Sequence, residues 1–276
     1  MAILRGIRSK RVVLAAVAAI PFVALFGTGP SSRLGVEEND ARHHAAGAAR
    51  SVAAKIDMHF GALENLLRRL GAAVSTDPSD VDANDALLRQ AKSEQPAIIA
   101  NIFLLARDGR NIGNAVGQHA AAGDRDYFQR ALAGASLVVG NPIRSRSNLG
   151  WVIPVARPLM HGGGEIRAVL AAATFLDGFR DVIDIDDLPP GSVVRIVGDD
   201  GTEVTTIARD PAASGADPVR LGNPARQSQR KEGSEVVTLD GNVMRVVGFA
   251  TTRRASWLVT VALPMDAAAV RLANGQ

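Results

Sequence analysis

Residues 34–76 carry an apolar repeat that predicts a single helix of about twelve turns. Arg, Glu, Asp and His fill the other faces of this helix. The stripe is richer than one small domain needs and its alanines allow close approach, so it also predicts a homodimer interface. We expect the helix to stop at Asp77–Pro78, because proline disfavours a helical residue before it. The stripe comprises Ala41, Ala45, Ala48, Val52, Ile56, Phe60, Leu63, Leu67, Leu70 and Val74.

From Pro96 onwards the apolar period is that of strands rather than that of a helix. Short apolar runs are separated by turn signals such as Arg107–Arg110 and Gly198–Gly201, which is typical of hairpins. The stretch Leu188–Gly191 divides the runs into two sets, so we expect an α+β fold with antiparallel sheets. The predicted strands are 98–106, 137–140, 151–156 and 166–174, then 193–197, 203–207, 235–239, 243–250 and 257–263; shorter helices are predicted over 81–93, 124–133 and 175–185.

The N-terminal segment has the pattern of a membrane anchor. Residues 1–11 form a tail with four basic residues, and residues 12–32 are uncharged, a run long enough to cross a hydrocarbon core of about 30 Å. The positive charges predict a cytoplasmic N-terminus and an extracytoplasmic, periplasmic main part held by a single pass in the inner membrane. A cleaved signal peptide is the first alternative, although no Ala-x-Ala site follows the run, and a buried core helix is the second.

The basic excess of the chain belongs to this same segment. The net charge is +3, but five basic residues and no acidic one lie in residues 1–33, which leaves 26 basic against 28 acidic residues in the rest. No basic stripe remains to follow a phosphate backbone, so we expect no nucleic-acid partner.

The sequence offers little for catalysis. It has no cysteine, no P-loop, no HExxH and no GxSxG, and its five histidines do not cluster as metal ligands would. We therefore expect no catalytic residue, no metal and no cofactor, and a protein that is not an enzyme.

One short segment, Asp124–Leu132, has the composition of a binding site. Arg125 precedes Tyr127, which is the single tyrosine of the chain, and Phe128 at a predicted helix start. Backbone N–H groups point outward at such a start, and an arginine can bind a carboxylate with two hydrogen bonds. The loop over 141–148 adds Arg144 and Arg146 ahead of Trp151. From the residues alone, a surface helix with a packed aromatic pair remains the alternative.

The order of these features resembles the double Cache sensor domain of bacterial chemoreceptors, histidine kinases and cyclic-dinucleotide enzymes. The resemblance covers nearly all of residues 10–270 and rests on a membrane helix, a long external helix, DRDYF, VVGNPI and WVIPVARPL. It implies two PAS-like modules supported by the long helix, with a ligand in the membrane-distal module.

The resemblance also implies roles for individual residues. Arg125 matches the arginine that binds a ligand carboxylate, and Tyr127 and Phe128 match the aromatic pair of the pocket. Thr174 falls where amino-acid sensors carry an aspartate for the ligand amine, and their tyrosine before the arginine is replaced by Ala120–Gly123. A small carboxylate or another compact polar ligand is therefore expected instead of an amino acid, with Arg144, Arg146, Trp151 and Thr174 also at the site.

These inferences together predict a membrane-anchored extracytoplasmic sensor that signals as a homodimer in a two-component system. The long helix and the short second helix span 34–94, the distal module 95–187 and the proximal module 188–264, followed by a tail over 265–276. Two alternatives stay open. The chain could be the sensory N-terminal part of a histidine kinase, diguanylate cyclase or chemoreceptor, or a structural adaptor without a ligand.

Overall fold

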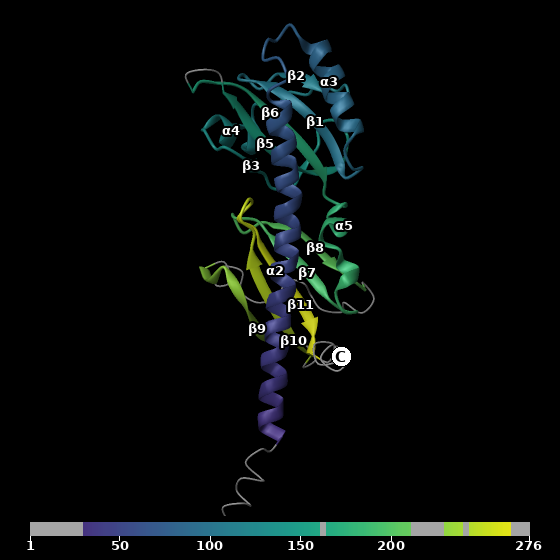
Figure 1. The fold of residues 1–276 in the computed structure, drawn as a ribbon, viewed down its shortest axis with the longest axis vertical. Coiled ribbons are helices and arrows are strands. Elements are labelled where there is room, and N and C mark those ends of the chain that lie inside the picture. The colour runs from purple at the N-terminus through teal and green to yellow at the C-terminus, as the bar shows by residue number, and fades with distance from the viewer. Residues whose placement is uncertain (1–29, 161–163, 211–228, 240–242, 266–276) are drawn as a thin grey trace, which may run out of the picture.

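The computed structural model describes residues 30–160, 164–210, 229–239 and 243–265. In this part of the chain one long helix runs past two antiparallel sheets that lie one above the other along it (Figure 1). The first half comprises α2 (Pro30–Leu70), α3 (Val81–Ser93), β1 (Ile99–Ala106), β2 (Asn111–Asn114), α4 (Asp126–Leu132), β3 (Val138–Val139), β4 (Ile143–Arg144), β5 (Trp151–Met160) and β6 (Ile166–Phe175). The second half comprises α5 (Phe179–Ile183), the 3-10 helix η1 (Ile185–Asp187), β7 (Val193–Val197), β8 (Glu203–Ala208), β9 (Glu232–Leu239), β10 (Val243–Thr251) and β11 (Leu258–Pro264).

The two sheets repeat one strand order. The first is ordered β2-β1-β6-β5-β3, with β4 paired to β5, and the second is ordered β8-β7-β11-β10-β9. With β4 set aside, each sheet runs second, first, last, fourth and third strand from one edge to the other. The chain therefore folds as two modules of like topology, as the α+β prediction with antiparallel sheets requires, and along the sequence residues 188–191 separate the strands of the first sheet from those of the second.

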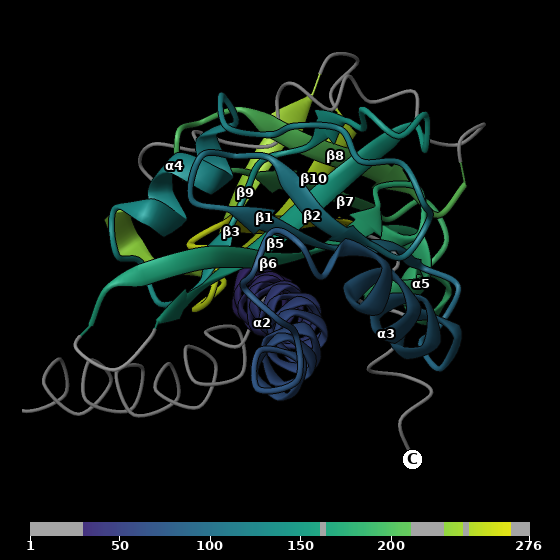
Figure 2. The ribbon, with the colours of Figure 1, turned by 90° about the horizontal axis from the view of Figure 1, so that it is seen from above.

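The apolar stripe of α2 is buried against both sheets. Ala45 packs on the second sheet, and Ile56 and Leu67 are also fully buried in a core that reaches into the first sheet. Figure 2 shows α2 and α3 on one face of the first sheet and α4 on the opposite face. The stripe is thus used within one chain, and a homodimer through α2 stays a prediction that would need other residues of the helix.

The long helix ends earlier than its apolar pattern predicts. α2 stops at Leu70, and residues 71–74 continue as turns rather than as helix to residue 76. One reason is Asn84 of α3, which is buried and takes both backbone groups of Ser75: its Oδ1 accepts from the Ser75 N–H at 2.9 Å and its Nδ2 donates to the Ser75 carbonyl at 3.0 Å. Those two groups are then not available to a helical ladder.

The predicted strands are confirmed to within a few residues, except that β5 continues to Met160 and β9 begins at Glu232. The helix predicted over 175–185 is shorter, limited to α5 and η1. The predicted anchor lies outside the described residues apart from 30–32, which begin α2, and the tail does so apart from Met265. Within the described ranges, no helix combines the length and the apolar character that a membrane crossing requires.

Candidate functional site

A pocket lies on the face of the first sheet that is turned away from α2. Its floor is formed by side chains of β1, β5 and β6, and its rim by β2, the loop before α4, and β4 with the loop that follows it. The volume open to the centres of water molecules is about 50 Å³. The lining residues are Asn101, Phe103, Asn111, Asn114, Ala120, Ala121, Ala122, Arg125, Tyr127, Ile143, Arg144, Ser145, Arg146, Ser147, Val152, Pro154 and Ala173.

The backbone places Arg125 at the start of α4. Arg125 is the N-cap residue, with an extended backbone at φ −79° and ψ 136°, so its side chain leaves the helix at the pocket rim. The preceding loop is fixed by a close contact of two glycines: a Cβ on Gly109 would lie 2.3 Å from the Cα of Gly123. Gly109 also has a φ of +84°, which favours glycine, so the turn that the sequence predicts over 107–110 supports the loop beneath Arg125.

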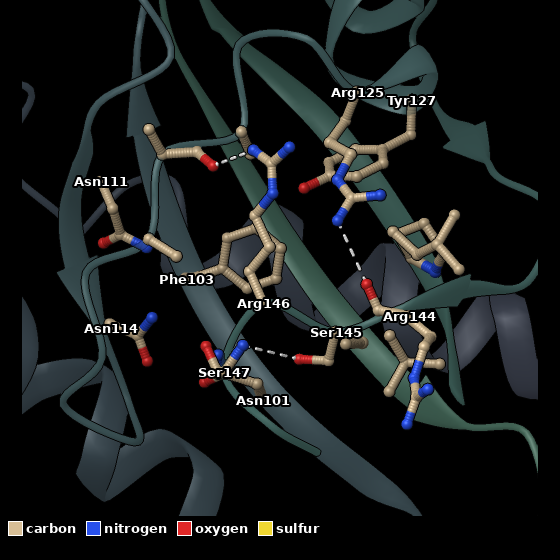
Figure 3. Close-up of a pocket in the computed structure, with 17 residues that line it drawn as sticks. Asn101, Phe103, Asn111, Asn114, Arg125, Tyr127, Arg144, Ser145, Arg146 and Ser147 are labelled. Atoms are coloured by element: carbon tan, nitrogen blue, oxygen red, sulfur yellow. Dashed lines mark hydrogen bonds between the residues drawn. The ribbon is translucent and has the colours of Figure 1, made fainter. Parts of the chain in front are cut away.

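Arg125 has no carboxylate partner within salt-bridge distance among the described residues. Its Nη2 donates to the backbone carbonyl of Arg144 at 3.1 Å, a bond drawn in Figure 3. A guanidinium offers five N–H donors, so this contact positions the side chain and leaves most of its donors open to a ligand.

Arg146 is already paired. Its Nη1 and Nη2 donate to the two carboxylate oxygens of Asp124 at 2.8 and 2.6 Å, and Nη1 also reaches the carbonyl of Ala121 at 2.5 Å. The hydrogen bonds from Arg146 hold the pKa of Asp124 below its ordinary value. Arg146 therefore ties the loop after β4 to the loop before α4 and contributes little free charge to the pocket.

Tyr127 forms an apolar wall beside Arg125 (Figure 3). Its side chain is buried, and its ring meets Phe103 edge-on at a centroid distance of 6.4 Å. Burial raises the pKa of Tyr127 to about 12, and the positive charges of Arg125 and Arg146 offset only part of this rise. The phenol is therefore a neutral group at ordinary pH.

The opposite wall consists of uncharged amides. Asn111 accepts at its Oδ1 from the Gly113 N–H at 3.2 Å, and Asn114 accepts from the Val116 N–H at 2.9 Å while donating to the Gln118 carbonyl at 2.6 Å. Asn101, on β1, is buried and its Oδ1 has no hydrogen-bond partner among the described residues. The lining contains three arginines and no Asp or Glu.

The structure brings together Arg125, Tyr127, Arg144 and Arg146, as the sequence predicts. Three other predicted site residues lie outside the pocket. Phe128 packs in the core behind α4 with Val138 and Ala171, because it leaves the helix on a different side from Tyr127.

Thr174 and Trp151 lie outside the pocket because side chains alternate along a strand. Ala173 faces the pocket, so Thr174 faces α2, where His59 Nε2 lies 3.1 Å from its Oγ1. Val152 and Pro154 face the pocket, so Trp151 does not, and its side chain is 53% exposed. Ala173, the neighbour of Thr174 that does face the pocket, carries no carboxylate for a ligand amine either.

Sequence reasoning missed the amide wall of Asn101, Asn111 and Asn114. Asn101 is the one polar residue in the apolar run 98–106, and this interruption is the signal that could have identified it.

No protein-family model matches the sequence, and no curated protein matches it. Solved structures match over nearly the whole chain at low identity. The ligand-binding domain of the Pseudomonas fluorescens chemoreceptor CtaA, solved with L-isoleucine, is 14% identical with a TM-score of 0.67 and covers 88% of this chain and 100% of its own.

Two further structures extend this comparison. The ligand-binding domain of the Pseudomonas aeruginosa PAO1 chemoreceptor PctB, solved with L-Arg, is 17% identical with a TM-score of 0.60 and covers 83% of this chain and 97% of its own. The extracellular domain of the putative histidine kinase rpHK1S-Z16 is 19% identical with a TM-score of 0.55 and covers 84% and 92%. The chain thus has the fold of the extracellular ligand-binding sensor domains of chemoreceptors and histidine kinases, in agreement with its resemblance to the double Cache sensors.

Proposed function

We propose that the chain is an extracytoplasmic sensor domain that binds a small carboxylate at Arg125. The observation that carries the proposal is the open charge of Arg125: this arginine has no carboxylate partner among the described residues, and no Asp or Glu lines the pocket. A carboxylate bound there would pair with the Arg125 guanidinium at the pocket rim.

The same lining disfavours an amino acid. The structures with L-isoleucine and L-Arg show that domains of this fold bind amino acids, whose ammonium needs an anionic or strongly accepting partner. The pocket of this chain offers only neutral amides and hydroxyls beside its arginines. A ligand that carries a carboxylate and no ammonium fits this arrangement better.

The cellular setting belongs to the same proposal. Residues 12–32 would hold the chain in the inner membrane as a homodimer, with both modules outside the cytoplasm. Ligand occupancy would be reported to an output domain or a partner such as those of histidine kinases and chemoreceptors, and the described part would bind its ligand without converting it.

The test is a calorimetric titration of the full chain with acetate, propionate and the uncharged analogue propionamide. We expect the two acids to bind and propionamide not to bind. Arg125→Ala should weaken acid binding by about thirtyfold or more, because truncating one partner of a partly desolvated charge pair costs about 2–5 kcal/mol. Arg167→Ala is the matched control, since Arg167 is exposed on β6 and pairs with Glu165 at 3.2 Å away from the pocket lining.

Equal affinities for wild type, Arg125→Ala and Arg167→Ala would contradict the proposal and place the site elsewhere. Equal binding of propionate and propionamide would contradict it as well, because a cationic site distinguishes them.

A further inference from the structure

We infer that the ligand is a small carboxylate with an oxygen substituent, a hydroxyl or an oxo group, that hydrogen bonds to Asn101. This inference rests on the proposed function, because it takes the carboxylate of the ligand to lie at Arg125. Asn101 would then determine which of the small carboxylic acids binds most tightly.

Asn101 lies in the floor of the pocket. Its side chain is 4% exposed, and it lines the pocket from the middle of the first sheet. The register of β1 against β6 shifts between Ile99, which pairs with Thr174, and Asn101, which pairs with Ala173. This bulge inserts one extra residue, and bulges beside binding sites commonly redirect a side chain.

The amide of Asn101 lacks the partners that a buried amide normally has. Its Oδ1 is buried and makes no hydrogen bond with the described residues. The other two asparagines of the lining are held by backbone groups of their own loop. A buried amide without a partner is costly, so its presence indicates that a ligand supplies the partner.

The charges around Asn101 restrict what that partner can be. An ammonium is disfavoured, because no Asp or Glu lines the pocket. A second carboxylate is disfavoured too, because Arg146 already binds both oxygens of Asp124 and the side chain of Arg144 is exposed to solvent. An uncharged oxygen remains: a hydroxyl can pair with either end of the amide, and an oxo group can accept from its N–H.

The size of the pocket restricts the ligand further. The volume open to the centres of water molecules is only about 50 Å³, which favours a compact ligand. Three-carbon acids with one oxygen substituent are such compact ligands.

The test uses four three-carbon acids that differ only at the second carbon: propionate, L-lactate, pyruvate and L-alanine. Each is titrated calorimetrically into the full chain, into Asn101→Leu, which removes the amide at similar volume, and into Arg125→Ala. We expect lactate or pyruvate to bind wild type about tenfold more tightly than propionate does. Asn101→Leu should remove this tenfold advantage, because one hydrogen bond contributes about that much to affinity. The same substitution should leave the affinity for propionate within about threefold of wild type.

The two oxygen substituents are separate arms of the experiment: a gain for lactate alone assigns a hydroxyl, and a gain for pyruvate alone assigns an oxo group. Asn101→Asp is a second variant that keeps the shape, and it should favour L-alanine over L-lactate. The ranking on wild type tests the inference even if neither variant folds.

The outcomes separate the two proposals. Arg125-dependent binding of propionate that is as tight as that of lactate and pyruvate overturns the role of Asn101 and leaves the proposed function standing. Failure of all four acids to bind overturns both. Tightest binding of L-alanine to wild type overturns the inference from the missing carboxylate.

Discussion

At the scale of single residues, Arg125 and Arg146 have different roles at the pocket rim. Arg146 is neutralised by Asp124, and its contacts with Asp124 and Ala121 join two loops. The Arg125 guanidinium makes one hydrogen bond with the described residues, to a backbone carbonyl, and no salt bridge with them, so its charge is available. Removing Arg146 should therefore loosen the pocket rim, whereas removing Arg125 should remove the ligand's counter-charge.

Tyr127 gives a prediction on the dependence of stability on pH. Its pKa is about 12 in the folded chain and about 10 when unfolded, so above pH 10 the unfolded state loses the proton while the folded state keeps it. This contribution is constant below about pH 10, and the free energy of unfolding then falls by about 2–3 kcal/mol as the pH rises towards 12.

Because Tyr127 is the single tyrosine, its ultraviolet absorbance reports this ionisation directly. We expect a tyrosinate midpoint well above 10, and a fall in stability that is smaller in Tyr127→Phe. A midpoint at the ordinary value of about 10 would show that the side chain is solvated and does not wall the pocket.

At the scale of elements, close packing of α2 on β10 joins the helix to the second module. A Cβ on Gly248 would lie 1.8 Å from the carbonyl oxygen of Ala45, so the helix backbone rests directly on the strand. A second anchor is Asp57, which is buried and accepts from the backbone N–H groups of Arg253 and Arg254 at 3.0 Å. The helix is thereby fixed to the hairpin between β10 and β11.

Two glycines near this contact give opposite predictions. Gly248→Ala should destabilise the chain by about 2–4 kcal/mol, because helix and strand must separate to admit the methyl group. Gly47→Ala should instead stabilise it by up to about 1 kcal/mol, since Gly47 lies within α2 and a Cβ there would meet only Arg50 Nη2, at 4.0 Å. Chemical denaturation of both variants measures the two effects, and a stable Gly248→Ala would contradict the close packing.

The elements also show how far sequence patterns reach. Most strands could be predicted because turn signals such as Arg107–Arg110 separate apolar runs, and α3 follows its predicted range of 81–93. The short strands β2 and β4 could not be predicted, because neither contains an apolar run. The end of α2 could not be predicted, because it depends on Asn84, nine residues along the chain from Ser75. The side of the sheet on which Thr174 lies could not be predicted either. Residues on both faces of β6 are buried, so the sequence shows no alternation of polar and apolar residues that would distinguish the two faces.

At the scale of the whole molecule, both modules share one core through α2. The largest buried cluster includes Ile102 and Leu104 of the first sheet together with Val194 and Val246 of the second. The modules also touch on the pocket side, where Asn141 Nδ2 donates to Asp200 Oδ2 at 2.8 Å. A groove beside this contact shares Arg125 and Tyr127 with the ligand pocket, so the pocket and the module interface have walls in common.

The position of bound propionate in a crystal structure of the chain tests the carboxylate site at Arg125 most directly. We expect its carboxylate within hydrogen-bond distance of the Arg125 guanidinium, on the face of the first sheet opposite to α2, with Ala173 and Tyr127 around its carbon atoms. Propionate in the groove of His43, His44 and Lys55 beside α2, with the Arg125 pocket empty, would contradict it.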